Sequence, residues 1–189
     1  MLLFEQYLIS QRPVSPPDAT FISGFFKKEA VKAGDYFVRN GNTCAKIAFV
    51  MEGVLKTCYT YADEEIIRYF AAEQHWIGNL GSFTHQKESP ESVCAISDCQ
   101  LLTISYYSFQ SLQRAYPDWD NVWQQISNRI ESARVNPYKG IISAKERYEG
   151  FIFAQPELAF RLSTEEIAAY LRIPHELLLQ ILCELLFDT

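Results

Sequence analysis

The stretch STEEIAAYLRIPHELLLQILCELL, residues 163–186, decides how the end of this chain folds. Ser163 and Glu166 have the spacing of a capping box, which satisfies the unpaired backbone amides at the start of a helix. Apolar residues then recur at helical spacing, stop at a corner at Arg172, and resume at Leu178 on a second helix. This pattern predicts a helix-turn-helix.

The outward face of the second helix differs from a surface that reads DNA. Such surfaces carry arginine, lysine, asparagine, glutamine or serine for phosphates and base edges. The recognition positions here are His175, Glu176, Leu179 and Gln180, of which only the histidine and the glutamine suit base edges. Between residues 164 and 189 a single arginine opposes five acidic residues. This charge reverses the attraction to phosphates on which DNA affinity largely depends.

Two further expectations follow from this part of the chain. If DNA is bound, we expect the phosphate contacts just before the helix-turn-helix, at Lys139, Lys145, Arg147 and Arg161. The second helix is also apolar nearly all round, and such helices are usually buried. A protein partner or the dimer partner would cover it. The alternative is a helix that packs into its own core on one side only.

The composition is typical of a cytoplasmic globular protein without a metal site. The 189 residues suffice for one sizeable domain and a small one, and the formal net charge of −6 disfavours nucleic-acid binding by the whole surface. The five cysteines form no CxxC pair, and none of the three histidines has metal-ligand spacing. The chain shows no signal-peptide pattern and no apolar stretch of membrane-spanning length. We therefore expect no metal and no bound cofactor.

The chain changes character along its length. Residues 1–30 indicate short helices broken by prolines. From residue 33 to 105, β-rich runs (YFVRN, KIAFVME, VLKTCYTY, EIIRYFA, SVCAIS and CQLLTIS) alternate with turn signals, which is typical of an all-β sandwich, barrel or roll. A further helix is expected over about residues 143–155. Four glycines lie at the corners between the β-rich runs: Gly34, Gly41, Gly53 and Gly78.

A long helix is predicted within residues 117–140. Its apolar residues Trp119, Trp123, Ile126 and Ile130 recur with steps of four, three and four, the heptad spacing of a helix that packs against a symmetry mate. The alternative is a helix docked on the β domain of its own chain. The spacing alone does not separate the two.

The order of these parts resembles the Crp/Fnr family of bacterial transcription regulators. The resemblance is carried by the segments AGDYFVRNGN, MEGVLK, WIGNLGSF, DCQLLTIS and STEEIAAYLRI. It implies an α+β chain that begins with a sensor domain at 1–116, built as a double-stranded β-helix of jelly-roll type (a β-roll). A dimerisation helix at 117–140 follows. The helix-turn-helix domain at 141–189 would be of the winged-helix type, short of a full wing.

The resemblance also implies a small-molecule site in the roll. In relatives that bind cyclic nucleotides, a glutamate accepts a hydrogen bond from the ribose, an arginine pairs with the phosphate, and backbone amides complete the pocket. A carboxylate in place of that arginine would repel a phosphate about 4 Å away by about 4 kcal/mol at an effective dielectric constant of about 20. The matching residues here form a degenerate effector pocket: Gly78, Asn79, Leu80, Gly81, Glu91 and Ser92.

The sequence thus predicts a cytoplasmic, homodimeric Crp/Fnr-like transcription regulator rather than an enzyme. Glu91 argues against a response to cyclic AMP. The aromatic residues Tyr69, Trp76 and Phe83 are compatible with an unidentified apolar effector. The occupied roll would act on the helix-turn-helix domains through the long helix. The alternative is a sensor or protein-interaction module on the same fold that binds no DNA.

Overall fold

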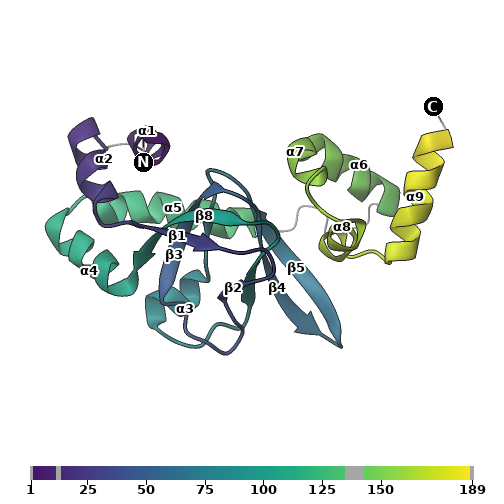
Figure 1. The fold of residues 1–189 in the computed structure, drawn as a ribbon, viewed down its shortest axis with the longest axis horizontal. Coiled ribbons are helices and arrows are strands. Elements are labelled where there is room, and N and C mark those ends of the chain that lie inside the picture. Colours follow the sequence, from purple (N-terminus) through teal and green to yellow (C-terminus); the bar gives the residue numbers. More distant parts are fainter. Residues whose placement is uncertain (1, 12–13, 135–142, 188–189) are drawn as a thin grey trace.

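The computed structural model describes residues 2–11, 14–134 and 143–187. A β-roll lies at the centre, and a group of helices from the end of the chain lies beyond one side of it (Figure 1). The α+β class and the order of roll, long helix and C-terminal helices confirm the fold predicted from the sequence. No helix within the described ranges is long and apolar enough to cross a membrane.

The first two helices are α1 (Leu2–Ser10) and α2 (Pro16–Ser23), which confirms the helices predicted before residue 30. α2 begins with a capping box and has prolines in its first turn, where a missing amide costs nothing. The ring of Phe4 contacts the rings of Phe49 and Trp76, with centroids 5.0 and 5.9 Å apart. This aromatic packing holds α1 on the roll.

Within the described residues, eight strands form two antiparallel four-stranded sheets. One sheet has the order β1-β8-β3-β6 and the other the order β2-β7-β4-β5, so that early strands pair with late ones as in a jelly roll. The strands are β1 (Lys27–Val31), β2 (Tyr36–Val38), β3 (Lys46–Glu52), β4 (Leu55–Tyr61), β5 (Glu64–Ala71), β6 (Trp76–Ile77), β7 (Ser92–Ala95) and β8 (Cys99–Ser105).

The six strands predicted from β-rich runs are confirmed, whereas β1 and β6 were not predicted. Residues 27–30 of β1 fall in the stretch interpreted as helical, and that interpretation is wrong there. β1 lies at the edge of its sheet and pairs only with β8 among the described strands. Its sequence KKEAV buries only Val31, so the strand lacks the alternation of apolar and polar residues that would reveal it.

Two of the corner glycines are required by close contacts. Gly53 and Gly78 have φ angles of 101° and 144°, which other residues rarely adopt. A Cβ atom on Gly53 would lie 2.5 Å from the Sγ of Cys99, and one on Gly78 would lie 2.5 Å from the Cδ1 of Ile47. Backbone contacts and φ together require glycine at 53, and the φ angle strongly favours it at 78.

The hairpin formed by β4 and β5 turns at Ala62 and Asp63. Their φ angles of 50° and 64° are those of a type I′ turn, whose twist matches that of the flanking strands. The run of acidic residues 63–65 therefore lies at a hairpin tip, where its side chains are exposed.

The helix α5 (Trp119–Ala133) packs its predicted seam on its own chain. It follows α3 (Leu80–His85) and α4 (Tyr106–Ala115). Trp119 is fully buried, and its ring lies 6.1 Å from that of Phe109 in α4. The four seam residues are buried or half-buried in the same core as the roll: Trp119, Trp123, Ile126 and Ile130.

The prediction of an exposed dimer seam on α5 is therefore wrong, and the alternative of a helix docked on its own β domain describes these residues. The physical reason is that one apolar stripe serves equally well against a sheet or against a second helix. The opposite side of α5 carries exposed polar residues such as Asp120, Gln124 and Asn128. Residues 135–140 of the predicted helix lie outside the described residues.

The C-terminal helices are α6 (Ala144–Ala154), α7 (Pro156–Ala159), α8 (Thr164–Leu171) and α9 (His175–Phe187). α6 confirms the helix predicted over residues 143–155. α8 and α9 lie where the helix-turn-helix is predicted, and α8 begins with the predicted capping box. Arg172 adopts the left-handed conformation (φ 56°) that ends α8. This conformation is unusual for a residue other than glycine.

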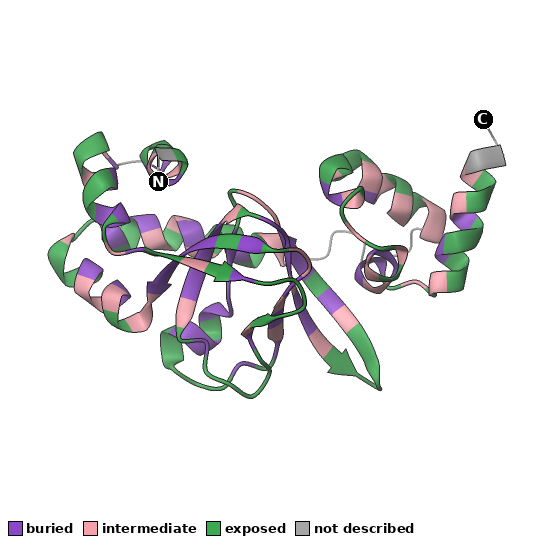
Figure 2. Cartoon of the chain, in the orientation of Figure 1, coloured by how far each residue is buried: buried purple, intermediate pink, exposed green. Residues whose placement is uncertain are grey.

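α8 docks on the β4–β5 hairpin through a second apolar core. The rings of Phe70 in β5 and Tyr170 in α8 lie 5.1 Å apart, and Ile67 belongs to the same buried cluster. α9 closes this core from the far side with Leu178, while Leu179 is exposed and much of the remaining helix faces solvent (Figure 2). The roll and the C-terminal helices thus share an apolar contact.

Replacing Trp119 with alanine tests where the apolar side of α5 packs. Because the side chain is fully buried in its own chain, we expect Trp119→Ala to lower the free energy of unfolding by about 3–5 kcal/mol. The loss should be the same at low and high protein concentration in urea denaturation. Gln124→Ala, on the exposed side of α5, should change stability by less than about 0.5 kcal/mol. A loss for Trp119→Ala that grows on dilution would instead indicate a subunit contact.

Candidate functional site

The predicted effector pocket is built around the start of α3. Asn79 is buried and caps this helix: its Oδ1 accepts a hydrogen bond from the amide of Ser82 at 2.9 Å. Its Nδ2 donates to the Oε2 of Glu91 at 3.1 Å. Both ends of the Asn79 side chain are therefore hydrogen-bonded within the protein.

Glu91 is the centre of this region. The residue is only 4% exposed, and its carboxylate is held by two arginines from different elements. The Nε of Arg68 in β5 lies 2.9 Å from Oε1, and Arg134 at the end of α5 donates to Oε2. Ser89 fixes the backbone, because its hydroxyl donates to the Glu91 carbonyl at 2.7 Å. A buried carboxylate is tolerated because it is paired and hydrogen-bonded in this way.

The other predicted pocket residues have structural roles. Leu80 is buried in the core, and Gly81 lies in the first turn of α3, where a Cβ would meet only ordinary contacts. The hydroxyl of Ser92 accepts a hydrogen bond from the amide of Asn40 at 3.0 Å. The structure thus brings Asn79 and Glu91 together but gives Leu80, Gly81 and Ser92 no ligand-facing contact of their own.

Sequence reasoning missed Arg68 and Arg134 as members of this site. Arg68 interrupts the apolar run EIIRYFA, which could have marked it as a residue with a specific partner. Its guanidinium lies 5.1 Å from the ring of Tyr59, which fixes its direction. No local signal marks Arg134, since it meets Glu91 only because α5 packs across the roll.

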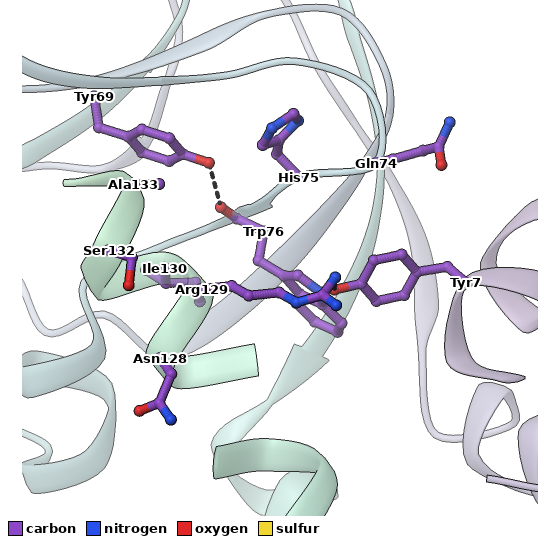
Figure 3. Close-up of a pocket in the computed structure, with 10 residues that line it drawn as sticks. All are labelled: Tyr7, Tyr69, Gln74, His75, Trp76, Asn128, Arg129, Ile130, Ser132 and Ala133. Atoms are coloured by element: carbon purple, nitrogen blue, oxygen red, sulfur yellow. Dashed lines mark hydrogen bonds between the residues drawn. The ribbon is translucent and has the colours of Figure 1, made fainter. Parts of the chain in front are cut away.

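A cavity of about 410 Å³ lies between α1, α5 and the turn that leads into β6 (Figure 3). Tyr69 and Trp76, two of the three aromatic residues suggested for an apolar effector, line it, and Tyr69 donates to the carbonyl of Trp76 at 3.4 Å. The third, Phe83, is buried in the core against Phe109. The cavity is within the size range of small-molecule sites.

The predicted recognition residues differ in what they offer at the surface of α9. His175 is half-buried, and its Nε2 lies 2.8 Å from the hydroxyl of Thr164 at the start of α8. Glu176, Leu179 and Gln180 are exposed. Gln180 is thus the one predicted base-contacting residue whose side chain extends freely from the helix.

The predicted phosphate contacts are largely engaged within the chain. Arg161 forms a two-pronged ion pair with Glu73 at the end of β5, with N–O distances of 2.7 and 3.1 Å. Arg147 donates to the carbonyl of Leu171 at 3.2 Å and so braces α6 against α8. Lys145 lies in α6, and Lys139 lies outside the described residues. Arg161 therefore serves as a link between the roll and the C-terminal helices.

The tip of the β4–β5 hairpin faces the corner between α8 and α9. A cavity of about 470 Å³ separates them, and its lining carries four carboxylates beside the single arginine, Arg172. The carboxylates that line it are Glu64, Glu65, Glu165 and Glu176. Such a field opposes the approach of a phosphate to the start of α9.

Two side chains in this part of the structure have strongly shifted pKa values. The Arg161 guanidinium beside Glu73 lowers the pKa of that carboxyl to about 2 from its usual 4.5. Burial raises the pKa of the Cys58 thiol to about 12, so it is not a reactive thiolate at neutral pH. Among the described residues, no group of three histidine, cysteine, aspartate or glutamate side chains could hold a metal ion.

Comparisons with known proteins agree with this geometry. Residues 28–116 match the family model of the cyclic nucleotide-binding domain. No curated protein is significantly similar in sequence. Residues 28–116 are therefore similar to cyclic nucleotide-binding domains.

Solved structures extend the likeness over most of the chain. CLP, the c-di-GMP responsive global regulator of Xanthomonas campestris, is 16% identical, with a TM-score of 0.70 over 88% of this chain and 89% of that one. FixK2 from Bradyrhizobium japonicum is 14% identical, with a TM-score of 0.72 over 86% and 85%. A putative regulator of the Crp/Fnr family from Eubacterium rectale is 15% identical, with a TM-score of 0.72 over 97% and 88%. The chain has the fold of Crp/Fnr regulators, which confirms the resemblance drawn from its sequence.

The ion pair between Glu73 and Arg161 predicts a specific acid sensitivity. Because the folded state lowers the pKa of Glu73 to about 2, the stabilisation is complete above pH 4.5 and is lost as the pH falls toward 2. We expect wild type to exceed Glu73→Gln in unfolding free energy by about 1 kcal/mol or less at pH 6, since both side chains are 36% exposed. The difference should shrink between pH 4.5 and about 2 in urea denaturation.

Glu157→Gln is the matched control, because it removes an exposed carboxylate from the neighbouring helix α7. Its difference from wild type should not depend on pH in this way. A difference between wild type and Glu73→Gln that stays constant down to pH 3 would contradict the assigned pairing.

Proposed function

We propose that the protein is a homodimeric transcription regulator that binds DNA through α8 and α9. The observation that carries this proposal is the order of the parts along one chain: a cyclic nucleotide-binding domain, a helix docked on it, and two C-terminal helices joined by a tight corner. Regulators of known structure share this order over more than four-fifths of their length. Their likeness supports the fold directly and the activity by analogy.

The proposed regulator does not respond to cyclic AMP. The place at which the resemblance puts an arginine for the phosphate holds Glu91, and both oxygens of that carboxylate are paired within the protein. A cyclic phosphate would meet a buried negative charge and would have to displace two arginines from it. The cavity beside Tyr69 and Trp76 is a separate candidate for an effector of another kind.

DNA binding requires a rearrangement of the C-terminal helices in this proposal. In the described structure Arg161 is paired with Glu73, and acidic residues of the hairpin face the start of α9. Release of α8 from the hairpin would free Arg161 for a phosphate and would remove the acidic tip from the approaching backbone. The described form is then the one with low DNA affinity.

The homodimer is proposed on the likeness of fold and not on α5 as the sequence suggested. The apolar side of α5 faces its own roll, and the exposed side is polar. A dimer contact through this side would resemble a wet interface rather than a coiled-coil seam. The exposed leucines Leu177 and Leu179 of α9 also keep a protein partner as the alternative to DNA.

Salt-dependent DNA binding tests the proposal. We expect selection from a random duplex library at about 50 mM salt to enrich a palindromic sequence, with log K falling linearly against log salt. Lys139→Ala combined with Lys145→Ala should reduce the magnitude of this slope by about 2, because two phosphate contacts are lost. Fluorescence anisotropy with labelled duplexes measures both quantities.

Lys27→Ala combined with Lys28→Ala is the matched control, since it removes the same charge from β1 in the roll. The control should keep the wild-type slope. Absence of duplex binding at about 50 mM salt would contradict the proposal and favour the interaction module.

Cyclic AMP provides a second test. Because Glu91 is buried, negative and already paired, we expect no saturable binding of cyclic AMP in titration calorimetry up to about 1 mM. The thermal unfolding midpoint should also stay unchanged, since a ligand that does not bind the native state cannot stabilise it. Saturable binding in this range would show that the pocket is not closed to phosphates.

A further inference from the structure

The electrostatic arrangement of the roll pocket is the reverse of the one implied by the resemblance. In a cyclic-nucleotide pocket the ligand brings the anion and the protein brings the cation. Here the chain itself supplies the anion, Glu91, and the cations Arg68 and Arg134 come from β5 and α5. We propose that Glu91 is an internal anionic ligand of the roll, which holds the end of α5 on the roll in place of a bound effector anion.

The burial of Glu91 and Arg134 shows that the carboxylate is a bound group and not a surface charge. The Glu91 side chain is 6% exposed and that of Arg134 is 12% exposed. Water cannot fully solvate a carboxylate or a guanidinium group buried in this way, so both groups stay charged only when they are paired. The Asn79 side-chain amide donates a third hydrogen bond to the carboxylate, and the Ser89 hydroxyl holds the backbone carbonyl of Glu91.

The position of Arg134 gives the cluster its mechanical effect. Arg134 caps the C-terminus of α5, where a cation is also favoured by the helix dipole. It directly precedes residues 135–142, which lead to α6. Glu91 thus ties the point at which the chain leaves the roll to the loop before β7. This tie requires no small molecule.

The charge balance predicts what happens when Glu91 is removed. Two guanidinium groups share one carboxylate, so the loss of Glu91 leaves two cations around a carboxylate-sized space. Such a space is a binding site for a small anion. Formate or acetate added to Glu91→Ala should therefore restore the missing contact, whereas wild type should not respond.

Hydrogen exchange of α5 is the readout, measured by mass spectrometry on peptides that span residues 126–134. We expect Glu91→Ala to exchange these amides at least about tenfold faster than wild type, because the last turn opens locally. Formate or acetate should slow the exchange again in a saturable manner. Glu131→Ala is the matched control, since it removes an exposed carboxylate from the same helix, and it should match wild type with and without anion.

A second variant keeps the test decisive if Glu91→Ala does not fold. Arg134→Gln removes only the partner on α5 and leaves Glu91 paired with Arg68. It should speed exchange of the same peptides without rescue by formate or acetate, because the carboxylate is still in place.

The proposal is overturned if the end of α5 exchanges as in wild type in either variant, or if anions do not slow the exchange of folded Glu91→Ala. Neither readout involves DNA, so a failure of the proposed regulator function would be distinguishable from a failure of this inference.

Discussion

The packing of the apolar side of α5 on the roll is the contact on which the other features depend. Trp119, Ile126 and Ile130 are buried in one core with both sheets. Because this side of the helix faces inward, α5 runs across the roll and delivers Arg134 next to Glu91. The same packing turns the polar side of the helix to solvent. The position of one helix thus decides both the ion cluster of the pocket and the kind of surface available to a second subunit.

Both regions that the fold would use for binding are occupied by ion pairs of the chain itself. In the roll a carboxylate stands between two arginines, and at the C-terminal helices Arg161 pairs with Glu73. The two cases differ in strength. Glu91 and Arg134 are buried and depend on the pairing of their charges, although Arg68 is partly exposed. Both members of the Arg161 pair are about one-third exposed, so water and salt weaken it. The second contact is therefore the easier one to open.

Local sequence signals predicted the elements but not the contacts between them. The β-rich runs, the corner glycines and the capping box at Ser163 each report on a few neighbouring residues, and each was confirmed. β1 was missed because an edge strand need not alternate. The heptad pattern of α5 was read wrongly because the same spacing suits a sheet and a helix partner. Arg68 and Arg134 were missed because only the folded chain brings them to Glu91.

The core beneath α8 has a consequence for how the protein unfolds. Ile67 and Phe70 belong to β5 of the second sheet, and Val54 directly precedes β4. All three also belong to the core of the C-terminal helices, together with Tyr170. Detaching those helices exposes a strip of apolar strand on the roll, and neither part then has a complete core. We therefore expect the two parts to unfold together, with loss of order in α8 lowering the stability of the β4–β5 hairpin. A proteolytic cut between them would leave the roll with an exposed apolar strip that promotes aggregation, and not an independently stable sensor domain.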